Sequence, residues 1–112
     1  MKFICPIVLA GLFPFIVERN HDGDTFTGLV ETRPDLYERV TVRLDCLYAP
    51  ELKQDGGLEA KARLAAFLDG GVMLETRWKR EKYGRLLGQP VKGDAGYCRP
   101  PLLPARWATE GP

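Results

Sequence analysis

Alternation of hydrophobic and polar side chains predicts three strands in the first half of the chain. Residues 13–19 are rich in aromatic and β-branched side chains, and the pattern resumes over 25–31 after an Asp-Gly turn at 21–24, which predicts a hairpin. Residues 32–38 are predicted to be a polar connection to a third strand. That strand breaks into a loop at Ala49-Pro50, and its alternate apolar residues are expected to face a core: Val40, Val42, Leu44 and Cys46. Its other face is polar and is expected to be open: Thr41, Arg43 and Asp45.

The pattern changes to a helical period over 58–69. One face of this predicted helix is apolar: Ala60, Leu64, Phe67 and Leu68. A Gly-Gly pair at 70–71 is a typical helix end. Alternation returns over 72–80, and 84–88 is the start of a predicted fifth strand.

Five strands with a helix between the third and fourth predict a mainly β fold, a small closed or nearly closed barrel with the helix across one end. At 112 residues, the chain has room for one domain, which we place at 13–112. From about residue 89 onward, repeated prolines predict an irregular tail: Pro90, Pro100, Pro101 and Pro104.

Residues 1–12 form an apolar N-terminal segment that has two interpretations. It is either a signal peptide, with Val8 and Ala10 at a small-residue cleavage site, or the approach to the first strand. The protein is secreted in the first case and cytoplasmic in the second. The apolar run is too short for a membrane span, so we expect no stable membrane partner.

Overall composition is that of an ordinary soluble domain, and the net charge of +1 predicts no general basic field for nucleic acid. Three cysteines show neither metal-type spacing nor a disulfide framework. Cys46 is expected to be a small buried thiol. If Cys5 is removed with a signal peptide, Cys46 and Cys98 remain as a pair.

Charged residues near the predicted turns allow a chemical interpretation beside a structural one. Asp22 and Asp24 flank a glycine and either present oxygens to a hard cation such as calcium or only shape a hairpin turn. Arg43 and Arg85 either hold a phosphate through their guanidinium forks or are solvated. Glu51 follows the break at Ala49-Pro50 and is either functional or a plain loop carboxylate.

The segment 77–85 combines basic and aromatic residues, a local pattern that is hidden in the overall charge. Its basic residues alternate with Trp78 and Tyr83: Arg77, Lys79, Arg80, Lys82 and Arg85. Such a segment either binds nucleic acid or forms a solvated hairpin.

Taken in order, four motifs resemble the staphylococcal (micrococcal) nuclease family. They are His-Asp-Gly-Asp-Thr at 21–25, Val-Arg-Leu-Asp-Cys-Leu-Tyr-Ala-Pro-Glu-Leu at 42–52, Glu-Ala-Lys at 59–61 and Lys-Tyr-Gly-Arg-Leu-Leu at 82–87. The resemblance covers roughly residues 13–88. It implies a five-stranded OB-fold barrel and calcium-dependent hydrolysis of phosphodiester bonds in DNA or RNA.

The resemblance also implies roles for individual residues. Asp24 would be a calcium ligand, joined by the backbone carbonyl of Ala49. Arg43 and Arg85 would hold the scissile phosphate, and Glu51 would orient or deprotonate the attacking water. These roles agree with the need of a phosphodiester in reaction for fixed positive charge and a placed base.

Nucleotide contacts would come from Lys82 and Tyr83, with Lys79 and Arg77 in the surrounding patch. One position departs from the family, because Tyr48 stands where a second calcium-binding aspartate is usual, and calcium affinity should fall. We expect a monomeric endonuclease weakened at its metal site. One alternative is a non-catalytic OB-fold module that binds single strands; another is a degenerate chain with only structural value.

Overall fold

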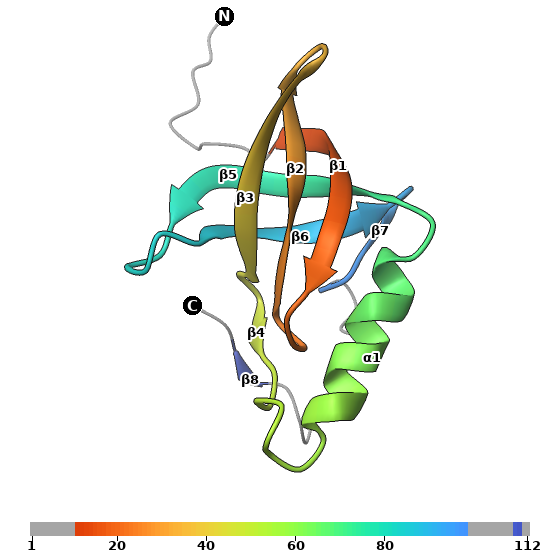
Figure 1. The fold of residues 1–112 in the computed structure, drawn as a ribbon, viewed down its shortest axis with the longest axis vertical. Helices are drawn as coiled ribbons and strands as arrows, with labels where there is room; N and C mark the ends of the chain where they lie inside the picture. The colour runs from red at the N-terminus through yellow and green to blue at the C-terminus, as the bar shows by residue number, and fades with distance from the viewer. Residues whose placement is uncertain (1–10, 99–108, 111–112) are drawn as a thin grey trace, which may run out of the picture.

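The computed structural model describes residues 11–98 and 109–110 (Figure 1). Its elements in chain order are β1 Gly11–Asn20, β2 Thr25–Arg33, β3 Leu36–Leu44, β4 Leu47–Tyr48, α1 Gly57–Leu68, β5 Val72–Arg80, β6 Leu86–Lys92, β7 Ala95–Gly96 and β8 Thr109–Glu110. The predicted tail beyond residue 98 and the segment 1–10 lie outside this description, apart from β8. Within the described residues, no helix is both long and apolar enough to cross a membrane.

Five strands close into a barrel. β1, β2 and β3 form an antiparallel meander, and β1 also pairs with β5, which pairs with β6. β6 then pairs with β3 in parallel, from Val42 opposite Leu86 to Leu44 opposite Gly88, which closes the circle. The predicted barrel, with its helix between the third and fourth long strands, is confirmed, and it is consistent with an OB-fold.

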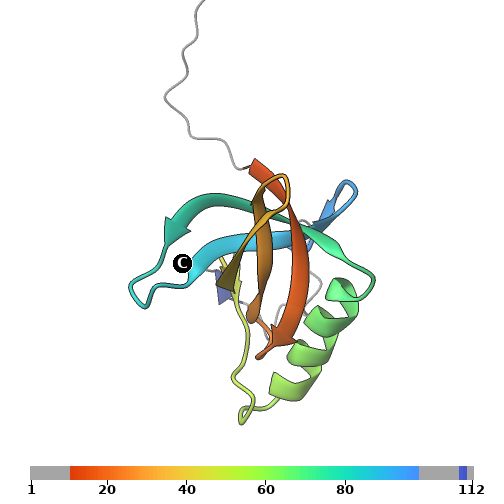
Figure 2. The ribbon, with the colours of Figure 1, turned by 45° about the horizontal axis from the view of Figure 1, so that its top comes forward.

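Helix α1 lies beside the lower end of the barrel and connects β4 to β5 (Figures 1 and 2). Ala60, Leu64 and Leu68 are buried against the barrel, as the helical period predicts, and Phe67 is partly buried. Alternate residues of the strands complete one core, and its fully buried members include Phe26, Val30, Val42, Leu44, Leu74 and Leu86. Burial of apolar surface is the main force that holds such a small barrel together.

Two regions are more regular than the sequence predicts. Residues 32–38 are not a loose connection, because β2 and β3 extend to a tight turn at 34–35, where Asp35 has a φ of 64° and its N–H donates to Glu31. This hairpin end needs only backbone pairing, so it lacks an apolar pattern. β6 also continues through Pro90, whose carbonyl accepts the Tyr97 N–H, so regular structure extends past residue 89.

The prediction for Cys46 is also wrong. Cys46 is not a buried free thiol: it is partly buried and forms a disulfide with Cys98. The bend after β3 turns Cys46 toward the segment that follows β7. The sequence left this pairing open as one alternative, and could not decide it because the two cysteines are 52 residues apart in the chain.

Candidate active site

The Asp22-Gly23-Asp24 turn joins β1 to β2 and packs tightly against two other segments. A Cβ atom at Gly23 would lie 2.7 Å from both the Ala49 and the Ala60 Cβ atoms, so only glycine fits. The turn is also braced internally, because the Asp24 N–H donates to Asp22 Oδ1 at 3.0 Å. The glycine therefore places two carboxylates beside the loop that follows β4.

Asp24 is buried and connects three parts of the fold. Its Oδ1 accepts the Thr25 hydroxyl at 3.0 Å, and its Oδ2 accepts the Ala49 N–H at 3.0 Å. The same Oδ2 lies 3.6 Å from Nη2 of Arg43. This carboxylate thus fixes the position of Ala49 relative to the barrel, and one of its oxygens is already shared between a backbone donor and a cation.

The position of Arg43 in the alternation predicts an open strand face. In the structure, however, Arg43 is only 4% exposed. The chain after β3 folds back over it, and Nη1 donates to the carbonyls of Leu44 and Leu47. The Tyr48 ring covers the guanidinium at 4.4 Å from its centroid. Arg43 is therefore a fixed, largely desolvated positive charge, and Tyr48 stacks on a cation.

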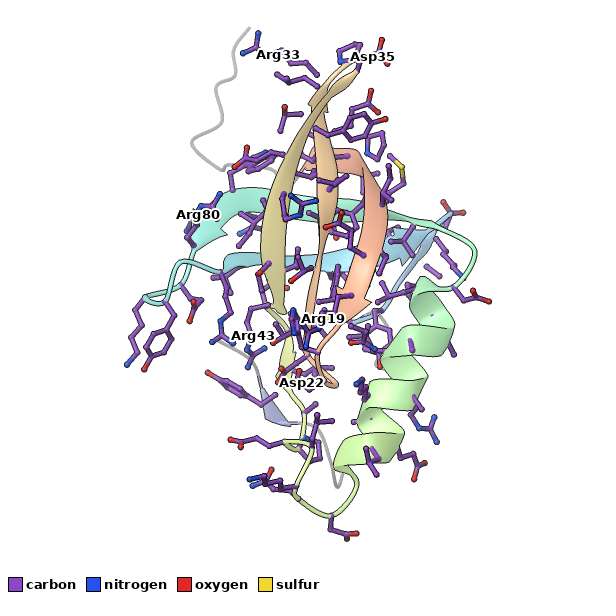
Figure 3. The ribbon with its side chains drawn as sticks, in the orientation of Figure 1. Arg19, Asp22, Arg33, Asp35, Arg43 and Arg80 are labelled. Carbon is purple, nitrogen blue, oxygen red and sulfur yellow. A yellow bond between two sulfur atoms is a disulfide. The ribbon has the colours of Figure 1, made fainter. Side chains whose placement is uncertain are left out.

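One cavity of about 530 Å³ contains all five residues for which the sequence predicts a catalytic or metal-binding role. Its lining consists of Asp22, Asp24, Arg43, Tyr48, Ala49, Glu51, Leu52, Lys53 and Arg85. Figure 3 shows Asp22 and Arg43 at the same lower end of the barrel, below β2 and β3. Segments that are up to 63 positions apart in the sequence, from residue 22 to residue 85, meet there.

The Asp22 carboxyl, which lines this cavity, has a raised pKa. Burial, and then the neighbouring Asp24 carboxyl, raise its pKa to about 6. Two carboxyl groups in close contact favour either a shared proton or a cation. Carboxylate and carbonyl oxygens are the ligands that calcium prefers, so Asp22, Asp24 and the Ala49 carbonyl are a fitting donor set. The sequence predicts a candidate cation turn that includes Asp22, but it predicts a metal role only for Asp24.

Glu51 does not join Asp22 and Asp24 in a cluster of three carboxylates. Glu51 lines the same cavity and is exposed. In residues 11–98, the one group of three potential side-chain ligand atoms within 4.8 Å of one another is Asp45, Cys46 and Cys98, and its two sulfurs form the disulfide. The Glu51 carboxylate therefore lies outside such a cluster, although it lines the same cavity.

Arg85 enters the cavity from the turn between β5 and β6. Its Nη2 donates to Glu81 Oε2 at 3.0 Å, and Glu81 Oε1 accepts the N–H groups of Tyr83 and Arg85. This pairing raises the pKa of Arg85 and lowers that of Glu81 to about 2. The buried Nε has no hydrogen-bond acceptor among the described residues. The sequence motifs did not single out Glu81, although its position four residues before Arg85 is a recognisable signal.

The predicted nucleotide-contact residues lie outside the cavity. Tyr83 is 73% exposed at the tip of the β5–β6 turn, with Lys82 Nζ at 5.1 Å and Arg85 Cζ at 5.8 Å from its ring centroid. Arg77 and Lys79 are exposed on β5, where the register with β6 shifts between residues 76 and 80. Arg77 lines a different cavity, beside the disulfide. Of these four residues, Tyr83 is thus near Arg85, which lines the candidate site, and Lys82 is near Tyr83.

No protein-family model matches this sequence. Over 92 residues, or 82% of the chain, it is 33% identical to a protein from Escherichia coli O157:H7 and to one from Escherichia coli, each named "Uncharacterized endonuclease". The aligned region covers 56% of each of these proteins, so the chain spans little more than half their length. The chain is therefore similar, over most of its own length, to proteins that carry the name endonuclease.

Proposed function

We propose that this chain is a calcium-dependent endonuclease that hydrolyses phosphodiester bonds of DNA or RNA in the cavity between the Asp22–Asp24 turn, β4 and Arg85. The observation that carries the proposal is the convergence of two carboxylates, a general-base candidate and two guanidinium groups on one solvent-accessible cavity. The similarity to endonuclease-named proteins supports the same reaction class. Monomeric action is part of the proposal.

Asp22, Asp24 and the Ala49 carbonyl would hold calcium, which supplies positive charge that neutralises the phosphate and its developing negative charge. The protein adds two fixed cations of different character. Arg43 is locked by backbone carbonyls and by Tyr48, so it contributes charge without having to reorganise. Arg85 is held on one side by Glu81 and lines the cavity, where its guanidinium would face a phosphate oxygen.

Glu51 is the base candidate because it is the exposed carboxylate of the cavity. In this proposal it accepts a proton from water while the water oxygen forms its bond to phosphorus and the P–O ester bond breaks, and the leaving oxygen keeps the bonding electrons and takes a proton from solvent. A placed carboxylate of this kind typically contributes about 10²–10⁴ in rate. The negative charge that builds on the phosphate oxygens lies near Arg85, which offers directional donors there.

The experiment uses end-labelled single-stranded DNA, RNA and duplex DNA, with products separated by length and binding followed by fluorescence anisotropy. The proposal expects new internal cleavage products with calcium and none with a chelator. Tight, salt-dependent binding without products would instead favour the non-catalytic module, to which the exposed Tyr83 and its neighbouring lysine are suited.

Tyr48→Asp is expected to lower the calcium concentration that gives half-maximal cleavage. The variant adds a charged oxygen to the lining of the cavity, and calcium sites gain affinity with the charge of their ligands. Loss of the ring above Arg43 should cost only modest stability, because Tyr48 is 46% exposed. Calcium titration of cleavage and a thermal melt measure the two effects separately.

Tyr48→Phe is the matched control, since it keeps the stacked ring without adding a carboxylate. It should leave the calcium response of cleavage unchanged. An unchanged calcium response in a folded Tyr48→Asp protein would show that the ligands are not assembled around this loop.

A further inference from the structure

The segment 46–51, here called the site limb, carries much of the candidate site. Its Leu47 carbonyl accepts from Arg43, its Tyr48 ring covers the same guanidinium, and its Ala49 N–H donates to Asp24. Glu51 enters the cavity from its end. A displacement of the limb would therefore disturb the arginine, the carboxylates and the base together.

The site limb packs on the barrel through the buried Leu47 and the partly buried Ala49, but its short strand lies outside the strand pairing of the barrel. The Asp45 N–H donates to the Gly88 carbonyl at 3.2 Å, just after the last residue pair between β3 and β6. Beyond that point, β4 pairs with β8 rather than with a barrel strand, through Leu47 opposite Glu110 and Tyr48 opposite Thr109. Because β4 has two residues and no ladder to a barrel strand, its position depends on side-chain contacts and on the covalent link at its start.

The Cys46–Cys98 disulfide joins the start of this limb to a well-anchored segment. The Cys98 N–H donates to Gln89 Oε1 at 3.0 Å, and the buried Gln89 in turn donates to Glu75 at 2.7 Å. The neighbouring Tyr97 is fully buried, and its N–H donates to the Pro90 carbonyl at 3.0 Å. Cys98 is thus fixed to β6 by hydrogen bonds and core packing, and the disulfide extends this anchorage to the limb.

We propose that the Cys46–Cys98 disulfide positions the site limb, so that calcium binding and cleavage depend on the oxidised state of this pair. The inference rests on the proposed nuclease function. A dithiol reductant would convert the disulfide into two thiols and itself become a cyclic disulfide, by two successive thiol–disulfide exchanges. The active form therefore belongs to an oxidising compartment, where such bonds persist.

The test compares oxidised and dithiol-reduced protein at room temperature, with mass spectrometry to establish the state of the pair. We expect reduction to raise the half-saturating calcium concentration and to slow cleavage at saturating calcium by about tenfold or more, because small misplacements of catalytic groups are costly. Calcium binding is also measured by calorimetry, which needs no turnover. Circular dichroism verifies that the reduced barrel is still folded.

Two variants separate the pair from other thiol effects. Cys5→Ser removes the third thiol, leaves the pair intact and should respond to reductant like the parent. The double variant Cys46→Ala with Cys98→Ala should behave like the reduced parent in both redox conditions. Lower thermal stability alone is expected of any lost disulfide, so a melt is not the deciding measurement.

A reduced, folded protein with unchanged calcium affinity and unchanged cleavage would overturn the proposal and leave the nuclease function intact. Failure of the oxidised protein to cleave any nucleic acid with calcium would overturn the nuclease function, and this inference with it. Restoration of calcium affinity and cleavage on reoxidation is the result that the proposal requires.

Discussion

Arg85→Ala is expected to slow cleavage by about 10²–10³ at saturating substrate, the usual loss when a fixed donor to the transition state is removed. Arg85 lines the cavity, and Glu81 holds its Nη2 at 3.0 Å, so its guanidinium is a positioned donor for a bound phosphate. Single-turnover kinetics on a single-stranded oligonucleotide measure the change. The ion pair with Glu81 is partly buried, so a thermal melt of the variant verifies that the slower cleavage does not come from unfolding.

Lys79→Ala is the matched control, because Lys79 is an exposed cation outside the cavity. It should weaken binding slightly and reduce the salt dependence of binding, with turnover almost unchanged. Arg85→Lys tests the geometry further, since it keeps the charge but loses the planar fork of donors. Equal and modest effects of Arg85→Ala and Lys79→Ala on turnover would favour the binding module over the enzyme.

Asp22→Asn is expected to have opposite effects without and with calcium. In calcium-free protein, burial and the Asp24 carboxyl raise the Asp22 pKa to about 6. A raised pKa in the folded state means that the stability contribution is fully present below the unfolded value near 3.8 and is lost as pH rises through about 6. Above pH 7 the asparagine variant should therefore melt at a higher temperature than the parent, and this difference should disappear as the solution is acidified.

With calcium, the same substitution removes a charged ligand, and the half-saturating calcium concentration should rise by about tenfold or more. The parent should also lose calcium affinity below pH 6, where a proton competes for Asp22, and the variant should lose less. Asp94→Asn removes the same charge from an exposed turn outside the cavity and should change neither property. A calcium response of Asp22→Asn equal to that of the parent would exclude Asp22 as a ligand.

Elements that bury one face were predictable from sequence, because burial imposes a period. The alternation from Val40 to Leu44 and the helical stripe through Ala60 and Leu64 correspond to buried positions in the barrel. The far end of the β2–β3 hairpin was missed because exposed strands impose no such pattern. The irregular tail was predicted to begin too early, at Pro90. A proline lacks the N–H donor, but its carbonyl can still accept a hydrogen bond within a strand.

Within the candidate site, sequence located the residues but not their environment. Four motifs in order were sufficient to predict that Asp24, Arg43, Glu51 and Arg85 meet, and they do line one cavity. Parity along β3 could not show that the returning chain covers Arg43, nor that Tyr48 stacks on it. The raised pKa of Asp22 and the Cys46–Cys98 bond likewise depend on contacts between segments, which no local pattern contains.

The most direct measurement of the central claim is cleavage of a labelled single-stranded oligonucleotide by the disulfide-intact protein as calcium is removed and restored. The proposed site predicts internal cleavage that stops when a chelator is added and resumes when calcium is returned in excess, with a half-saturating concentration that rises below pH 6. Cleavage that continues at the same rate without calcium, or none at any calcium concentration from a folded protein, would contradict the account.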